Sequence, residues 1–351
     1  MRLSVLDQSI SRAGRSQGDS IRQTIELARY CETLGYHRFW VSEHHNHDTI
    51  TGTAPEIVMA AIGATTERIR IGSAGVMLPH YAALKVAEQF RVLDAIAPGR
   101  IDLGLGRAPG SDGRTAYALN PQAMQGADNF PAQIRDLLAW VSGEPLPAEH
   151  AFAGIRAFPQ GDTVPVTWML GTSNYGAQVA AHFGIPYCFA HFITQGEGCA
   201  QALDIYRQQY QPSARHPDPE TTICVWALMA DTEEEAEFQF MSRARTRLAR
   251  DRGSLVQVEA PDVAAAHDYS PAEEARIRAM RADAFVGTPE TVGARLRTLA
   301  GQLGLDELVI LTWAYETDAL KRSYELFARE FEIAQSGSCR NPLSRCAGTG
   351  R

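Results

Sequence analysis

Eight apolar, strand-like segments follow one another along the chain, and most of them are followed by a helix-like segment. The series opens with "RLSVL" and closes with "DELVILT". The segments span residues 2–6, 38–42, 69–77, 100–106, 164–170, 186–190, 221–230 and 306–312. Strands that alternate with helices form parallel sheets, and eight such units close into a barrel. The sequence therefore predicts the α/β class and a (β/α)8 TIM barrel.

The segments between these strands carry helix signals. Ser20, with Gln23 three residues later, indicates a capping box at the start of the first helix, which Gly35 would end. Thr288 followed by Pro289 marks the start of a later helix. Further helices are expected over about 55–66, 81–97, 130–142, 175–183, 197–210 and 317–333.

One long segment breaks the alternation, between the seventh and eighth strands. Residues 232–286 carry charged helical sequence and a softer piece rich in Ala and Asp, which we interpret as an insertion in the barrel. A chain of 351 residues is within the range of one such barrel with insertions. We expect one barrel domain over 1–335 and a disordered tail over 336–351, where neither periodicity nor apolar content supports packing.

Charge and cysteine content exclude several classes of protein. The formal net charge is −8 and there is no long basic block, so nucleic acid is not an expected partner. No stretch approaches 18 uninterrupted apolar residues and no signal peptide is visible, which predicts a cytoplasmic protein without a membrane span. The six cysteines form no C-x-x-C or metal-finger spacing, so we expect free thiols.

Polar and aromatic residues follow seven of the eight predicted strands. Barrel enzymes carry their chemistry at the C-terminal ends of the strands, so these residues should converge on one face. They are Asp7-Gln8, Glu43-His44-His45, Leu78-Pro79-His80, Arg107, Gly171-Thr172-Ser173-Asn174, His191 and Trp313. The agreement of so many strand ends predicts a functional site at this face.

Two local patterns at these strand ends allow more than one interpretation. His45 and His47 have the spacing of a metal-binding pair, but adjacent residues on an extended backbone point to opposite faces, which argues against a cluster with Glu43 and His44. The segment 171–174 before a helix could bind a phosphate with Arg107, or it could be an ordinary helix cap.

Several longer blocks of sequence resemble a known family. They are "SEHH" (42–45), "GSAGVMLPHYAALKVAEQF" (72–90), "GRIDLGLGRAPGSD" (99–112) and "MLGTSNYGAQVAAHFGIP" (169–186). Their order and spacing resemble those of the bacterial-luciferase-like flavin monooxygenases, and the resemblance extends over about residues 1–333. Gly106 stands where the luciferase catalytic subunit has a reactive cysteine, so the resemblance does not imply light emission.

The resemblance implies roles for individual residues. It places the flavin ring beside Ala74-Gly75, joined in relatives by a non-prolyl cis peptide, and it makes His44 the active-site histidine. Glu43 matches the carboxylate below the flavin, and Arg107 the arginine on the phosphate side. The matching phosphate cradle comprises Gly171, Thr172, Ser173, Asn174 and Tyr175. No metal is implied.

The resemblance also implies an activity and partners. The first hypothesis is an FMN-dependent monooxygenase that oxidises a small organic substrate with reduced FMN and O2. Because no nicotinamide-binding unit is visible, a separate flavin reductase would supply the reduced FMN. The alternatives are a dehydrogenase or reductase that uses the deazaflavin coenzyme and a flavin-binding protein without turnover. Relatives imply a homodimer through the helices over 55–66 and 81–97.

Overall fold

The computed structural model describes residues 1–108, 110–122 and 129–333, and the expected tail over 336–351 lies outside them. The strands are β1 (Arg2–Asp7), β2 (Arg38–Val41), β3 (Arg70–Ser73), β4 (Val76–Met77), β5 (Ile101–Gly106), β6 (Val166–Gly171), β7 (Tyr187–Phe189), β8 (Thr221–Met229), β9 (Phe285–Gly287) and β10 (Glu307–Leu311). The helices up to β7 are α1 (Gln17–Leu34), α2 (Pro55–Gly63), α3 (Ala83–Ile96), α4 (Gly113–Leu119), α6 (Phe130–Ser142) and α7 (Asn174–Phe183), with a 3-10 turn η1 (Leu78–His80). The later helices are α8 (His191–Thr194), α9 (Cys199–Gln209), α10 (Glu233–Asp251), α11 (Pro261–Ala265), α12 (Pro271–Asp283), α13 (Pro289–Leu303) and α14 (Thr317–Glu330).

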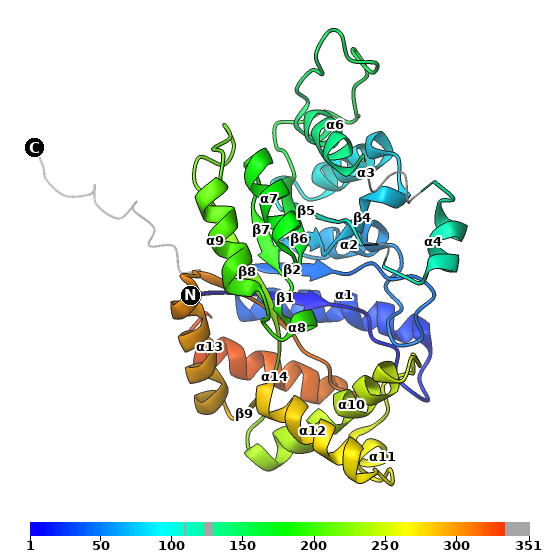
Figure 1. The fold of residues 1–351 in the computed structure, drawn as a ribbon, viewed down its shortest axis with the longest axis vertical. Coiled ribbons are helices and arrows are strands. Elements are labelled where there is room, and N and C mark those ends of the chain that lie inside the picture. Colours follow the sequence, from blue (N-terminus) through cyan, green and yellow to red (C-terminus); the bar gives the residue numbers. More distant parts are fainter. Residues whose placement is uncertain (109, 123–128, 334–351) are drawn as a thin grey trace, which may run out of the picture.

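The strands form a closed parallel barrel of eight strand positions, with the helices outside it (Figure 1). The order runs β10-β1-β2-β3-β5-β6-β7-β8, and pairing of β10 with β8 closes the barrel. The register is set by pairs such as Val5 with Ile310 and Val41 with Ser73. The predicted TIM barrel is confirmed.

Three details differ from the sequence prediction. The third predicted strand is divided into β3 and β4 at Ala74-Gly75. The short elements α4, α8 and β9 were not predicted, because pieces of three to seven residues carry too little periodicity to be recognised. The first helix is capped by Ser16, whose hydroxyl oxygen accepts a hydrogen bond from the Asp19 N–H, and not by Ser20, which is buried on the helix face.

The segment between β8 and β10 packs against the C-terminal end of β8. Helices α10 to α12 lie together at the lower end of the molecule in Figure 1, and β9 pairs with the last residues of β8. Phe240 and Leu248 of α10, with Met280 of α12, are buried in the same apolar cluster as Trp226 of β8. The segment also reaches the loop after β2, where the Thr49 hydroxyl donates to the Val256 carbonyl at 2.6 Å. It therefore forms one wall of the end of the barrel where the site is expected.

A buried ionic network fills the opposite, N-terminal end of the barrel interior. Arg38, at the start of β2, donates to Asp102 at 3.0 Å, to Glu307 at 2.9 Å and to Glu220 at 3.0 Å. Its guanidinium carbon lies 4.7 Å from the centre of the Trp168 ring. Burial alone would raise the pKa of Asp102, but Arg38 and Arg70 hold it below its ordinary value. The network links β2, β5 and β10 across the barrel.

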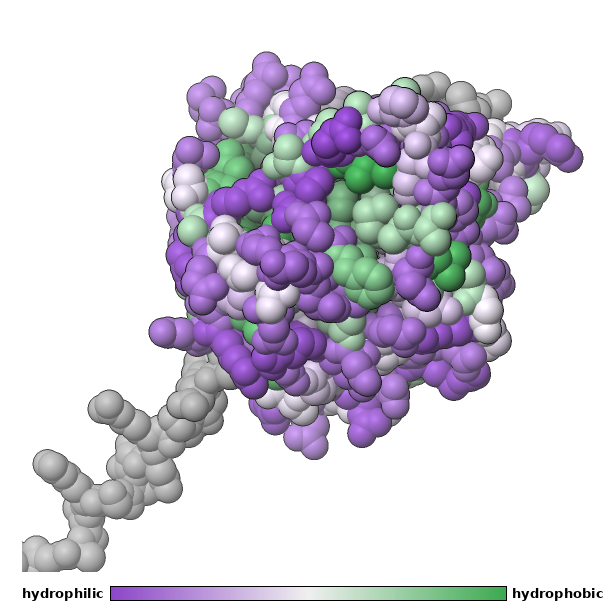
Figure 2. All heavy atoms as spheres, turned by 90° about the horizontal axis from the view of Figure 1, so that it is seen from below, coloured by the Kyte–Doolittle hydropathy of each residue, from purple (hydrophilic) through white to green (hydrophobic). Residues whose placement is uncertain are grey.

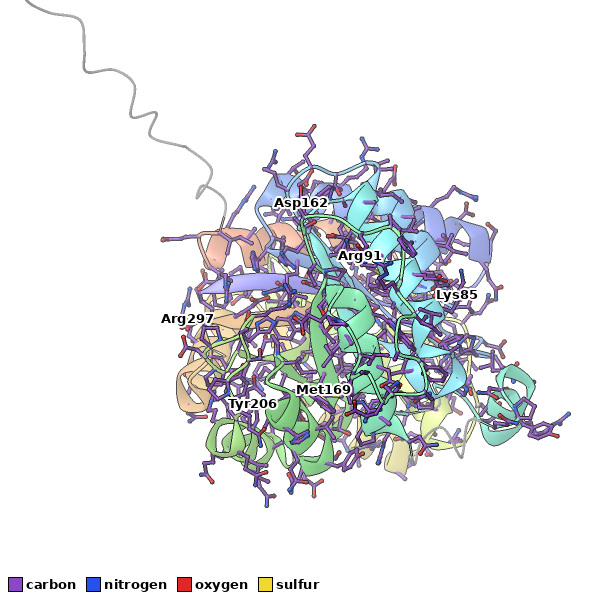
Figure 3. All side chains as sticks on the ribbon, turned by 90° about the horizontal axis from the view of Figure 1, so that it is seen from above. Lys85, Arg91, Asp162, Met169, Tyr206 and Arg297 are labelled. Carbon is purple, nitrogen blue, oxygen red and sulfur yellow. The ribbon has the colours of Figure 1, made fainter. Side chains whose placement is uncertain are left out.

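The outer helices are tied to the barrel by polar contacts as well as by apolar packing. Arg91 of α3 donates to the carbonyls of Pro159 and Thr163, at 2.9 and 2.6 Å, in the loop before β6. Figure 3 shows Arg91 and Asp162, which belongs to this loop, on the same side of the molecule.

Within the described residues, no helix is both long and apolar enough to cross a membrane.

Candidate active site

The segments that follow the strands lie at one end of the barrel, because parallel strands end on the same side. This end has an apolar floor inside the barrel. The floor is the upper part of a buried interior cluster that contains Trp40, Trp168, Trp226 and Leu311, and Ala74, Leu170, Phe192 and Trp313 pack against this cluster partly buried. Three groups of residues stand around the floor, and each is positioned by a different set of strands.

The first group lies where β5 and β6 end. Arg107 follows β5, and its exposed guanidinium lies 4.3 Å from the centre of the Tyr175 ring in the first turn of α7. Ser173 is the N-cap of α7, but its side chain does not cap the helix. Among the described residues, the N-terminus of α7 therefore combines backbone N–H groups and a Ser173 hydroxyl without partners with a nearby arginine, which together suit a phosphate. The structure brings Arg107 and residues 171–175 together, as the sequence predicted.

The second group is the break between β3 and β4. The peptide bond between Ala74 and Gly75 is cis, as the resemblance implies. The Ala74 N–H donates to the Val41 carbonyl at 2.7 Å, and a Cβ added at Gly75 would lie 2.8 Å from the Gly104 carbonyl oxygen. A side chain cannot be accommodated at position 75 unless β5 moves. Partly exposed Ala74 is therefore held rigidly at the floor.

Glu43 holds this break in place. Its side chain is 1% exposed, and its oxygens accept hydrogen bonds from the Met77 N–H at 3.1 Å and from the Tyr81 hydroxyl at 2.6 Å. His45 Nε2 lies 2.8 Å from the same carboxylate. Burial, with the neighbouring carboxylate, raises the pKa of Tyr81, which stays a hydrogen-bond donor at neutral pH. Because these contacts engage the Glu43 carboxylate with protein groups, Glu43 is better placed to position β4 beneath a ligand than to contact the ligand itself.

The third group contains His44 and His47. His44 Nδ1 lies 3.2 Å from the Ser42 hydroxyl, and its ring meets that of His47 edge-on with 5.6 Å between the centres. Burial, and then the nearby charges of His47 and Arg250, lower the pKa of His44 to about 4. At neutral pH His44 is therefore a neutral imidazole, which can accept a proton at one nitrogen and donate a hydrogen bond from the other.

The histidines do not gather around a metal position. His45 turns toward Glu43, whereas His47 Nδ1 accepts hydrogen bonds from the backbone N–H groups of Thr49 and Ile50 at 3.2 Å each. Among the residues that the structure describes, no group of three His, Cys, Asp or Glu side chains is placed to hold a metal ion. The four described cysteines, Cys31, Cys188, Cys199 and Cys224, are free and buried.

One part of the site was missed by sequence reasoning. Arg243, Arg247 and Arg250 of α10 lie beside the floor, and Arg243 stacks on Trp226 with 3.6 Å from its guanidinium carbon to the ring centre. The signal was present, since the three arginines have the i, i+4, i+7 spacing of one helix face. They were overlooked because only residues that directly follow a predicted strand were considered as candidates for the site.

The low pKa of His44 predicts a loss of stability in mild acid. Below pH 6.5 the unfolded chain takes up a proton that the folded state resists until about pH 4, so stability falls as the pH decreases through this window. From pH 7 to pH 5, His44 alone should cost about 2 kcal/mol. His37, with its pKa also lowered to about 4 mainly by burial, acts in the same direction. Urea unfolding of wild type and of His44→Gln at both pH values measures the difference.

A smaller pH dependence in His44→Gln than in wild type is the expected result. His182→Gln, a change at an exposed residue of α7, serves as the matched control and should behave as wild type. An unchanged pH dependence in His44→Gln would contradict the assignment.

Comparison with known proteins places the chain in a family. Residues 1–307 match the family model described as luciferase-like monooxygenase. A luciferase-like monooxygenase of Escherichia coli K12 is 36% identical, with 92% of this chain and 95% of the relative covered. An N-acetyl-S-alkylcysteine monooxygenase of Bacillus subtilis is also 36% identical, with 93% and 97% covered. The crystal structure of apo-MsnO8 superimposes with a TM-score of 0.86 at 33% identity, covering 95% of this chain and 98% of the other.

The chain belongs to the luciferase-like monooxygenase family. It is therefore an enzyme of the flavin-dependent oxidoreductases, as the resemblance implied. Two solved structures with 17% and 12% identity, at TM-scores of 0.68 and 0.66, share the fold.

Proposed function

We propose that the protein is a monooxygenase that uses reduced FMN and O2 to oxidise a small organic substrate. The observation that supports this most is the pairing of Arg107 with Tyr175 at the N-terminus of α7, next to the rigid Ala74-Gly75 break. One end of this arrangement suits a phosphate and the other suits a flat ring against a backbone surface. FMN carries both groups.

These residues would hold FMN in one orientation. Arg107 and residues 171–175 would hold the phosphate, and Ala74-Gly75 would support the ring, with Glu43 keeping β4 in place behind it. Bound reduced flavin would supply the electrons with which O2 is activated. The protein would provide orientation, exclusion of water by the apolar floor, and His44 as the group that moves a proton.

A neutral His44 suits the role of a base or a hydrogen-bond donor better than that of a strong acid. With Nδ1 directed to Ser42, Nε2 is the nitrogen left to act on a ligand. Because the pKa of His44 is about 4, this form persists through the physiological range.

The deazaflavin coenzyme is the main alternative to FMN. One solved structure with this fold is a type II Baeyer–Villiger monooxygenase of Pseudomonas putida in complex with FMN, and another is a secondary alcohol dehydrogenase with an F420-acetone adduct. In other proteins, this fold therefore binds FMN in one case and the deazaflavin coenzyme in another. The relative that is an N-acetyl-S-alkylcysteine monooxygenase favours oxygen chemistry here. A flavin-binding protein without turnover is the third possibility, and the poised His44 argues against it.

The reaction can be tested with labelled oxygen. Protein, chemically reduced FMN and an N-acetyl-S-alkylcysteine are mixed under heavy-isotope O2, and the product is analysed by mass spectrometry. A monooxygenase places one labelled atom in the product, while the other leaves as water and the flavin is oxidised. Product without label, or flavin oxidation by hydride transfer in the absence of O2, would contradict the proposal.

Arg107→Ala should weaken FMN binding with little effect on folding. A charge-assisted phosphate contact contributes about 1.5 to 3 kcal/mol, which corresponds to roughly 10- to 150-fold in affinity. Calorimetric titration with FMN and with riboflavin separates the phosphate contribution, because riboflavin lacks that group. Arg114→Ala, on nearby α4, is the control. Equal losses for both ligands would show that Arg107 does not contact the phosphate.

We also propose a separate flavin reductase and a homodimer. The outer faces of α2 and α3 expose large apolar side chains, with Ile57 at 67%, Val92 at 47% and Ile96 at 44%. Apolar residues gathered on one side of a molecule favour a protein contact. Light scattering would give twice the chain mass for a dimer, and a 38.4 kDa particle would contradict it.

A further inference from the structure

Helix α10 presents three arginines along the open end of the barrel, and they differ in their partners. Arg247 Nε lies 3.4 Å from Asp251 Oδ1, which balances its charge. Arg250 is exposed and close enough to His44 to lower the pKa of that imidazole. Arg243 lies one turn further from the helix end, over the barrel floor. Arg243 differs from the other two. It is partly buried, and within the described part of the chain no carboxylate or carbonyl accepts a hydrogen bond from it.

The surroundings of Arg243 are aromatic and apolar. Its guanidinium lies over the Trp226 ring, 3.6 Å from the ring centre, and its pKa is lowered by burial and then by the charge of Arg247. A guanidinium held partly out of water ordinarily has an anion or several acceptors around it. The indole N–H of Trp226 also has no acceptor in the described structure, although Trp226 is only 4% exposed. Two neighbouring hydrogen-bond donors thus lack a protein acceptor among the described residues.

Both donors belong to the wall of one cavity. Its lining includes Arg243, Trp226, Phe240, His191, Phe192 and Met280. Phe192 and Ala74 both pack against the interior cluster that contains Trp226, so the cavity and the proposed position of the flavin ring share this cluster. Figure 2 shows the molecule from the side on which α10 to α12 lie, where hydrophilic residues surround a group of hydrophobic ones. The cavity is apolar with a cationic end.

We propose that Arg243 binds a carboxylate of the substrate, with the apolar part of that substrate lying along Trp226 and Phe192 toward the flavin. This inference rests on the proposed function and defines its substrate class as small organic acids with an apolar chain. Guanidinium and carboxylate match in shape and form paired, charge-assisted hydrogen bonds, which gives the site both affinity and orientation.

Two alternative partners for Arg243 fit less well. Asp283 also lines the cavity, but it is exposed at the end of α12, and no ion pair joins it to Arg243 in the described structure. The FMN phosphate would be the second anion, but Arg107 and the N-terminus of α7 form a more complete phosphate site after β5 and β6. The geometry therefore favours an anionic group of the substrate as the partner of Arg243.

Calorimetric titration of the protein without flavin tests the proposal with octanoate and octanamide, which differ in charge and little in shape. Wild type should bind octanoate about 10- to 100-fold more tightly than octanamide, the usual contribution of a charge-assisted contact. Arg243→Gln should remove this preference, and Arg243→Lys should keep part of it. Arg278→Gln, an exposed arginine on α12, is the matched control and should bind as wild type.

The outcomes separate this proposal from the proposed function. Equal binding of the two compounds by wild type, binding of neither at millimolar concentration, or a preference that survives in Arg243→Gln with unchanged melting temperature would each overturn it. A preference for inorganic phosphate over octanoate would also overturn it. FMN binding is measured separately in each variant, so loss of the carboxylate site with intact FMN binding contradicts only the substrate class.

Discussion

His44→Ala should lower coupled turnover by about 100-fold or more, the usual effect of removing a proton-transfer group, while FMN affinity stays within a few-fold of wild type. The physical reason is that the proposed phosphate and ring contacts involve Arg107, α7 and Ala74-Gly75, whereas His44 contacts Ser42 and His47. The measurement is oxygen consumption against product formed, with chemically reduced flavin so that no reductase affects the result.

His45→Ala is the matched control for this change. His45 hydrogen-bonds Glu43 at 2.8 Å, so its loss should reduce stability and leave the coupling of the folded enzyme near that of wild type. The pH dependence adds a second criterion. Because the pKa of His44 is about 4, coupled turnover should show no acid limb near pH 6.5. If His44→Ala stays fully coupled, the histidine is structural and the proton comes from another group.

Arg38→Ala should be strongly destabilising. Its side chain is almost fully buried and balances Asp102 and Glu307, which are 0% and 2% exposed. Removing one partner of a buried ion pair leaves an uncompensated charge and typically costs about 3 to 5 kcal/mol. Urea unfolding followed by circular dichroism measures the loss, provided that the variant is purified under stabilising conditions.

Arg2→Ala provides the comparison, because Arg2 approaches the same carboxylates from the surface. Its guanidinium lies 3.5 Å from Glu307 and 3.9 Å from Glu220, with 48% of its side chain exposed. Exposed pairs contribute about 0 to 1 kcal/mol. A loss in Arg38→Ala no larger than that in Arg2→Ala would show that the network does not depend on the buried guanidinium.

The barrel was predictable because its signal is repeated. Each apolar strand with its following helix gives weak evidence, but eight in series leave few alternatives, and helix α6 was predicted with the bounds it has in the structure. The short elements α4, α8 and β9 depend on their packing and not on periodicity. Ser20 was predicted to be the cap because Gln23 follows it by three residues. Ser16 and Asp19 have the same spacing one turn earlier, and Ser16 is the actual cap. Local capping rules do not choose between two such candidates.

The site was partly predictable for a similar reason. Arg107 follows β5, and residues 171–175 run from the last residue of β6 into α7. Neighbouring parallel strands bring such segments together. The role of Glu43 as a support of β4 required the fold, since Met77 and Tyr81 are more than thirty residues away in sequence. Arg243 required the path of the insertion, because no strand end marks its position.

An anaerobic titration with reduced FMN, oxidised FMN and the reduced deazaflavin coenzyme tests the central claim most directly. Affinities are measured by calorimetry on the same preparation of wild-type protein, with Arg107→Ala beside it. If the protein receives reduced FMN from a reductase and releases it oxidised, reduced FMN should bind more tightly than both oxidised FMN and the deazaflavin coenzyme, and the preference for FMN should weaken in Arg107→Ala. Tighter binding of the deazaflavin coenzyme, equal affinity for the two forms of FMN, or no binding of FMN would contradict the account.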